Sequence, residues 1–299
     1  MICCLENEKS VFLVDTLGAE MQSFQLKGDG KEYVWQAKPT VWNRHAPILF
    51  PIIAGLKDGY YTIEGRKYDM ELHGFAKDIE FKVVEQTSTS LHLQLTSEML
   101  DEKYIKSYPF IFQLDVIYTL EGASVSKKHI VTNLGKTRMY YELGGHDGYN
   151  IALEEDETME DYYLDLNMDI ASIDALVLHP ESRHVTKDIR THKLEHGKYN
   201  VGMETFSGDT FIIHKPEFNR VTLRSEKSSR FIDFMFEGFD VFAMWSAYKD
   251  GKVTNYVCLE PWSSLPDCEY LGQELEEKVD VKILERGESA IYKFTTTIG

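Results

Sequence analysis

The sequence has few cysteines, and their spacing does not suggest a metal site or a disulfide framework. Its 299 residues include Cys3, Cys4, Cys258 and Cys268, with no Cys-x-x-Cys pair among them. Neither a zinc site built on cysteines nor a fold stapled by disulfides is indicated. Free thiols are typical of a reducing compartment, so we expect a cytoplasmic protein.

Long apolar runs are also missing. The longest, residues 46–56, is interrupted by Pro47 and Pro51 and falls far short of the ~20 residues that cross a bilayer. The first nine residues, MICCLENEK, contain no basic segment followed by an apolar one, so they do not predict a signal peptide.

Positive charge is scarce as well. There are 32 Lys and Arg against 49 Asp and Glu, which gives a formal net charge of -17. Such a surface repels nucleic-acid backbones and anionic lipids, so we expect neither nucleic acid nor membrane as a partner. A small anion could still bind wherever a few arginines or lysines converge.

Helical periodicity is rare, and alternation of apolar with polar residues dominates. Strands are predicted at residues 91–95, 110–120, 232–236 and 279–283, the last paired with 292–294 around a turn at 286–289. Turn signals recur at residues 57–59, 64–65, 121–122, 196–197 and 249–251. The weak helix candidate is 159–168, and the acidic run 154–157 is expected to be a solvated loop. We therefore expect an all-β protein, a large antiparallel β-sandwich formed by one domain over residues 1–299.

Two motifs resemble known sites but lack essential parts. Residues 135–137, GKT, have the end of a phosphate loop, but Ile130 stands where glycine is required. Residues 192–196, HKLEH, match an inverted zinc-peptidase motif, which needs a helix and a third ligand. Gly197 follows at once, so we expect a polar turn between strands. No metal or organic cofactor is therefore expected.

The residues suited to proton transfer lie in short segments rich in glycine, proline and aromatic residues. They are Arg44 in NRHAPILFP (43–51), His73 in LHGF (72–75), His146 in GGHDGYN (144–150) and Glu260 in LEPW (259–262). A glutamate ending an apolar strand is expected to be partly desolvated, which raises its pKa. The small neighbours of both histidines are expected to let a ligand approach closely. Taken singly, each of these residues is more often structural than functional, and only their combination favours a site.

In combination, the segments resemble the aldose 1-epimerase (galactose mutarotase) family, and in particular its LacX-like branch. The family's motifs occur in order as Arg44 before Pro-x-Leu-Phe-Pro, then His-Gly-Phe at 73–75, residues 144–150, Asp209 to Ile213, Trp245-Ser246 and Glu260-Pro261-Trp262. This ordered set covers most of the chain. It departs from the usual pattern at Asp147, where the family has proline, at Gly148, and at Lys77, where arginine is common.

The resemblance implies a galactose mutarotase-like supersandwich with a sugar site in an open cleft. It implies Glu260 as the catalytic base, His146 as the acid serving the ring oxygen, and Arg44, His73 and Asp209 as sugar-binding residues. Asp174 is a rival to Asp209, which is preferred for its 51-residue spacing to Glu260. The carboxylate of Asp147 is expected to raise the pKa of His146.

The function that follows is cofactor-independent interconversion of the α and β anomers of an aldose by a monomer or homodimer. A carbohydrate-binding or regulatory protein without turnover, a sugar-phosphate epimerase, and a glycosidase or lyase using paired carboxylates remain alternatives.

Overall fold

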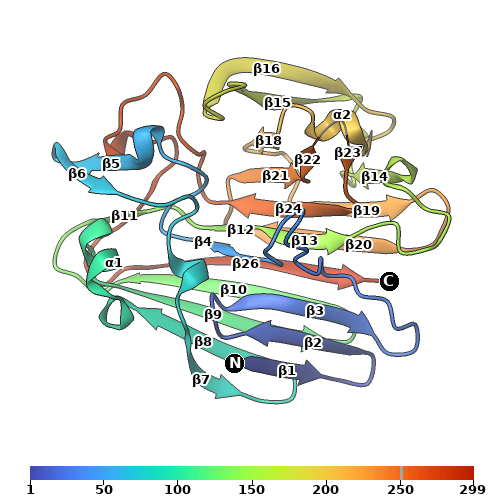
Figure 1. The fold of residues 1–299 in the computed structure, drawn as a ribbon, viewed down its shortest axis with the longest axis horizontal. Helices are drawn as coiled ribbons and strands as arrows, with labels where there is room; N and C mark the ends of the chain where they lie inside the picture. Colours follow the sequence, from blue (N-terminus) through green and yellow to red (C-terminus); the bar gives the residue numbers. More distant parts are fainter. Residues whose placement is uncertain (250–251) are drawn as a thin grey trace.

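Two large sheets form the body of the protein in the computed structural model, which describes residues 1–249 and 252–299. Strands make up 49% of the structure and helices 9%. Every pairing between named strands is antiparallel. The predicted all-β antiparallel class is therefore confirmed. Figure 1 shows the arrangement of the sheets.

The first large sheet has nine strands. In order across the sheet they are β17 (Lys198–Asn200), β14 (Tyr162–Asp165), β19 (Arg220–Ser225), β20 (Phe231–Glu237), β26 (Ser289–Ile298), β10 (Ser124–Asn133), β9 (Phe112–Glu121), β8 (Ser90–Thr96) and β7 (Lys82–Gln86). Strands β8, β9 and β20 cover three of the predicted strands. Their alternating apolar residues are buried, including Leu93, Val116 and Phe234.

The second large sheet contains Glu260 on one of its strands, and His146 lies between two others. Its strands are β16 (Val185–Lys193), β15 (Ser172–Leu178), β18 (Phe211–His214), β21 (Val241–Trp245), β24 (Tyr256–Trp262), β12 (Gly144–Gly145) and β4 (Ile48–Leu49), with β13 (Asp147–Asn150) also paired to β24. Strand β24 is buried along its whole length. A strand covered on both faces is expected to be almost continuously apolar, and β24 reads YVCLEPW, in which Glu260 is the exception.

Smaller sheets and short helices complete the chain. The sheets are β1 (Ile2–Glu6), β2 (Ser10–Asp15) and β3 (Glu20–Leu26); β5 (Tyr60–Ile63) and β6 (Arg66–Asp69); β11 (Met139–Tyr141) and β25 (Lys282–Leu284); and β22 (Tyr248–Lys249) and β23 (Lys252–Val253). The α-helices are α1 (Glu102–Ser107) and α2 (Met203–Phe206), and 3-10 turns occur at Lys57–Gly59, Ala76–Asp78, Ser97–Met99, Met159–Asp161 and Leu275–Glu277. Sheet β1–β3 packs on the nine-stranded sheet, where the rings of Phe12 and Tyr118 lie 5.3 Å apart.

Two local predictions are wrong, and a third falls partly outside the described residues. Residues 159–168 are not a helix but a 3-10 turn followed by β14. Strand β25 does not pair with β26: it pairs with β11, and its Leu284 is buried while Ile283 is exposed. The turn expected at 249–251 includes residues 250 and 251, which lie outside the described part of the chain.

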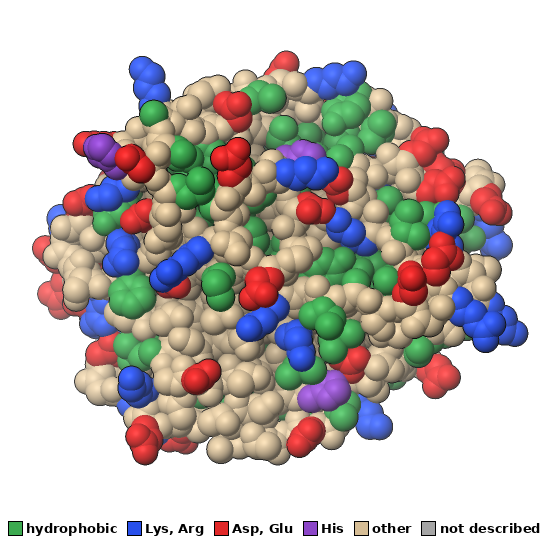
Figure 2. All heavy atoms as spheres, turned by 180° about the vertical axis from the view of Figure 1, so that it is seen from behind, with side chains coloured by type: hydrophobic (Ala, Val, Ile, Leu, Met, Phe, Trp, Pro, Cys, Tyr) green, Lys and Arg blue, Asp and Glu red, His purple; other side chains and the backbone are tan. Residues whose placement is uncertain are grey.

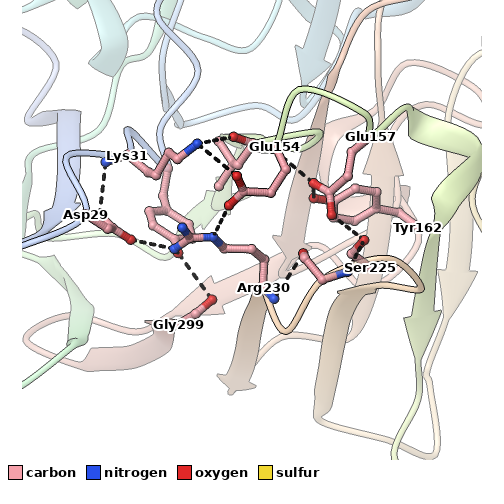
Figure 3. A network of polar contacts seen from close by, with 11 residues as sticks. Asp29, Lys31, Glu154, Glu157, Tyr162, Ser225, Arg230 and Gly299 are labelled. Carbon is pink, nitrogen blue, oxygen red and sulfur yellow. Dashed lines mark hydrogen bonds and ion pairs between the residues drawn. The ribbon is translucent and has the colours of Figure 1, made fainter.

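The acidic run 154–157 is only partly the solvated loop that was expected. Glu154 binds Lys31 and Arg230, and Arg230 also binds Asp29 and the hydroxyl of Tyr33 (Figure 3). Glu157 is 5% exposed and accepts hydrogen bonds from Tyr162 and Ser225. Glu155 and Asp156 are exposed as predicted. Glu154 is therefore held by a lysine and an arginine from distant segments, and the charge pattern of residues 154–157 alone could not predict these partners.

Candidate active site

A cleft of about 650 Å³ opens beside strand β24, and its walls bring together all five predicted site residues. Loops before β4, after β6 and before β18 surround it. Its lining includes Arg44, His73, His146, Asp209 and Glu260. A cavity of this size is large enough for a monosaccharide.

Glu260 and His146 form a deeply buried pair of titratable side chains in the cleft. Glu260 Oε1 lies 3.3 Å from His146 Nε2, and the two residues are only 1% and 7% exposed. Burial raises the pKa of Glu260 well above its ordinary value, and Asp209 and Asp147 add to this shift. Burial and nearby His73 lower the pKa of His146 well below its usual value. Both shifts disfavour charge, so the pair is most stable when its two side chains share one proton and neither is charged.

Neighbouring aromatic rings hold these two side chains in place. The indole of Trp42 stacks on the His146 ring with centroids 4.9 Å apart, and Trp245 meets the same ring edge-on at 5.5 Å. Trp262 Nε1 donates a 3.2 Å hydrogen bond to Glu260 Oε2. Glu260 is therefore left with Oε1 as the oxygen that faces His146.

The glycines around His146 serve packing rather than the approach of a ligand, which corrects the sequence-based interpretation. A Cβ at Gly145 would lie 2.9 Å from the ring of Phe294 on β26, and one at Gly144 would lie 2.8 Å from Trp262. At Gly148 a Cβ would meet Trp42 at 2.9 Å. These three positions allow β12 and β13 to lie close against large aromatic side chains.

His73 reaches the cleft through an unusual backbone conformation. Its φ is 63° and that of Gly74 is 67°, both in the left-handed region. The backbone N–H of Ala54 donates to His73 Nδ1 at 3.0 Å, which leaves the proton on Nε2. Burial, aided by Lys77, lowers the pKa of His73 to about 3. The ring is therefore a neutral donor, and its centroid lies 5.4 Å from that of His146.

Arg44 and Asp209 both line the cleft, and both are ion-paired. Arg44 Nη1 donates to the carbonyl of Lys77 at 3.1 Å, and its Nη2 binds Asp78. Asp209, with φ 85°, lies 3.4 Å from Arg183 Nε. The rival Asp174 lies on β15, accepts a bond from Thr191 and is absent from the lining.

Asp147 does not act on His146 as expected, and the predicted rise in the pKa of His146 is wrong. Its carboxylate turns into the sandwich and lies 3.3 Å from Lys127 Nζ on β10. Both side chains are at most 3% exposed. Burial raises the pKa of Asp147 to about 6 despite the nearby lysine. The residue thus links the two sheets beneath the site.

Sequence reasoning did not select Trp42, Cys258 or Arg183 as site residues. Trp42 could have been found from its position two residues before Arg44, and Cys258 from its place two residues before Glu260 on the same face of a strand. Arg183 lies in a loop whose sequence carries no comparable signal.

One group of ligating side chains in the described ranges could hold a metal ion. The ligand atoms of His146, Cys258 and Glu260 all lie within 4.8 Å of one another. An ion there would occupy both side chains of the acid–base pair. The HKLEH segment is not helical: His192 lies on strand β16 with its ring between Tyr199 and Phe211, and His196 lies in a turn beside Asp169.

Three further findings concern the surface, the helices and the cysteines. On the face that Figure 2 shows, acidic, basic and apolar side chains are interspersed. Within the described residues, none of the helices has the length and hydropathy needed to span a bilayer. The four cysteines are all free.

Comparison with known proteins relates this fold and cleft to one family. Residues 1–280 match the family model described as Aldose 1-epimerase. The chromosomal protein LacX of Lactococcus lactis subsp. lactis is 34% identical over 286 residues, covering 93% of this chain and 92% of the relative. A galactose mutarotase related enzyme from Lactobacillus acidophilus superposes with a TM-score of 0.92 at 29% identity, covering 100% of this chain and 97% of the other. A galactose mutarotase-like protein from Lactobacillus casei gives 0.90 at 26% identity, with full coverage of both chains.

Proposed function

The chain belongs to the aldose 1-epimerase family, and we propose that it catalyses the interconversion of α and β anomers of an aldose. The observation that carries this proposal is the buried contact between Glu260 Oε1 and His146 Nε2, 3.3 Å long, in the wall of a monosaccharide-sized cleft. Four free cysteines fit a cytoplasmic location.

Anomer exchange requires that the sugar ring open and close again. With Glu260 as carboxylate and His146 as imidazolium, Glu260 takes the proton of the anomeric hydroxyl. The C1–O1 bond becomes a carbonyl, the C1–O5 bond breaks, and His146 gives its proton to O5. The products are a neutral carboxylic acid, a neutral imidazole and an open-chain aldehyde.

The same two residues then complete the reaction in reverse. Rotation about the C1–C2 bond presents the other face of the carbonyl, and both protons return as the ring closes. The number of protons on the pair never changes, because each step moves one in and one out. The neutral pair that burial favours is therefore the form that accompanies the open-chain sugar.

The remaining cleft residues hold the sugar in this mechanism. His73 offers Nε2–H as a fixed neutral donor because Ala54 occupies its Nδ1. Asp209 offers a carboxylate to hydroxyl groups, and Arg44 offers guanidinium N–H donors. Trp42 and Trp245 give apolar surface against which the faces of a sugar ring can pack.

Polarimetry on freshly dissolved pure anomers tests the proposal. Positioned acid–base groups typically contribute ~10²–10⁴-fold each, so Glu260→Gln and His146→Asn should each slow the approach to equilibrium by at least about 100-fold. Circular dichroism checks that both variants are folded. Wild-type rates in both variants would overturn the assignment, and sugar binding by a wild-type protein without faster exchange would indicate a binding protein instead.

A further inference from the structure

A second cavity, of about 300 Å³, opens beside the sugar cleft. Hairpin β15–β16 and the segment between α2 and β18 form its walls. Arg183 and Thr210 line both this cavity and the cleft. The two spaces therefore adjoin along the side of the cleft where Asp209 lies.

The lining of the second cavity is basic and rich in hydroxyl groups. Its charged or titratable residues are Arg183, Arg190 and His192, and no aspartate or glutamate is among its lining residues. Three hydroxyl groups also line it, those of Thr205, Ser207 and Thr210, of which Ser207 donates to the carbonyl of Glu204 and Thr210 to Asp209. In a chain of formal net charge -17, a cavity with two arginines and no acidic residue differs sharply from the average surface.

The donors of these arginines are largely unused within residues 1–249 and 252–299. Arg183 places only its Nε near Asp209, at 3.4 Å, and its terminal amino groups donate to no described residue. Arg190 forms no ion pair with any described residue. Asp174, on the neighbouring strand, accepts a 2.6 Å bond from Thr191. Because side chains alternate along a strand, Thr191 and its partner face away from Arg190 and His192.

Guanidinium groups with free donors match the oxygens of phosphate or carboxylate, often through two parallel hydrogen bonds. A phosphate monoester carries about 1.5–2 negative charges at pH 7, so it gains most from such a site. The ring of His192 is fixed edge-on between Tyr199 and Phe211, at 5.4 and 5.1 Å, which presents it to the same space.

We propose that this cavity binds an anionic substituent of the substrate, so that the preferred substrates are aldoses carrying a phosphate or carboxylate far from the anomeric carbon. This inference rests on the proposed function of the cleft. The anomeric end lies at Glu260 and His146, the ring passes Asp209, and the charged end reaches Arg183 and Arg190.

Anomer exchange of three related sugars tests the inference: a neutral aldose, its 6-phosphate and its uronic acid. The kcat/KM for one of the two charged sugars should exceed that for the neutral sugar by at least about tenfold, since a charge-assisted hydrogen bond has roughly that effect. Which charged sugar is preferred identifies the source of the anionic group. Arg190→Gln should reduce the ratio of charged to neutral kcat/KM by about tenfold.

A matched control removes the same charge elsewhere. Arg286 lies in the turn before β26 and lines neither cavity, so Arg286→Gln should keep the wild-type ratio. Binding of inorganic phosphate, followed by 31P line broadening, gives a second readout that needs no turnover. It should weaken in Arg190→Gln and not in Arg286→Gln.

The outcomes separate the two proposals. Equal kcat/KM for neutral and charged sugars, with a ratio insensitive to Arg190→Gln, overturns the anion site and leaves the epimerase proposal standing. If no sugar is exchanged faster, the epimerase proposal fails, and phosphate binding then decides the anion site alone: loss in Arg190→Gln supports it, and no binding to wild type rejects it.

Discussion

At the scale of single residues, the proposed anomer exchange depends on one proton shared between Glu260 and His146. Burial works against a charge on either side chain, so adding a second proton and removing the shared one are both unfavourable. Trp262 binds one oxygen of Glu260 and Trp42 stacks on His146, so neither side chain can easily turn away. These contacts keep the pair in a single geometry for both halves of the reaction.

The pH dependence of kcat/KM follows from the direction of each shift, because kcat/KM reports the ionisation of the free enzyme. In acid, activity is lost when His146 is charged while Glu260 is already protonated. Because burial and His73 lower the pKa of His146, the midpoint of this acid limb of the pH profile should lie below 6.5. In alkali, activity is lost when the shared proton leaves the pair. Because burial raises the pKa of Glu260, the midpoint of this alkaline limb should lie well above 4.5. The measurement is kcat/KM from roughly pH 4 to 10, a range that should span both limbs. An acid limb centred above 6.5 would contradict this assignment, and residual activity of His146→Asn should lack that limb.

Asp147 provides a second test at this scale, on stability. Asp147→Asn leaves the ammonium of Lys127 buried without a counter-charge, and breaking such a pair costs about 3–5 kcal/mol. Urea unfolding should show this loss. The double variant Asp147→Asn with Lys127→Met should recover part of it, because no unpaired charge then remains. A double variant less stable than the single one would show that the pair is not the source of the effect.

At the scale of elements, the site depends on how closely β12 approaches the opposite sheet. A Cβ at Gly145 would lie 2.9 Å from Phe294, so Gly145→Ala should push β12 and the adjoining His146 away from β26. Overpacking of this kind typically costs about 1–3 kcal/mol, and we expect kcat to fall with it. Gly202→Ala is the control, since no atom lies within 4 Å of its added Cβ.

Rescue identifies the cause in that experiment. Adding Phe294→Leu to Gly145→Ala makes room for the new methyl group and should restore part of the lost activity. If Gly145→Ala behaves like Gly202→Ala in unfolding and in kcat, close packing at β12 does not position His146.

Alternation predicted individual strands well but not their partners. Leu93, Val116 and Phe234 repeat with a period of two, and each lies buried where that period places it. The pairing of β25 with β11 could not be foreseen, because partners far apart in sequence are chosen by the packing of the whole sandwich. Residues 159–168 failed as a helix for a similar reason: β14 is buried between β17 and β19, which overrides its weak helical pattern.

At the scale of the whole molecule, contacts between distant segments determine side-chain positions and partners that the local sequence does not predict. The five site residues come from segments between residues 44 and 260, and their convergence on one cleft was expected from the family resemblance rather than from periodicity. The arrangement of Arg230 with Asp29 and Glu154 likewise joins three distant parts of the chain (Figure 3). Asp147 was misjudged because its partner, Lys127, belongs to the other sheet.

Exchange of magnetisation between the α and β anomeric protons of a sugar at equilibrium measures the central claim most directly. With catalytic amounts of wild-type protein, NMR should show cross-peaks between the two anomers that are missing without protein. Glu260→Gln and His146→Asn should each abolish these cross-peaks while the sugar still binds, because both protons must move together. Cross-peaks of wild-type intensity in either folded variant would contradict the account.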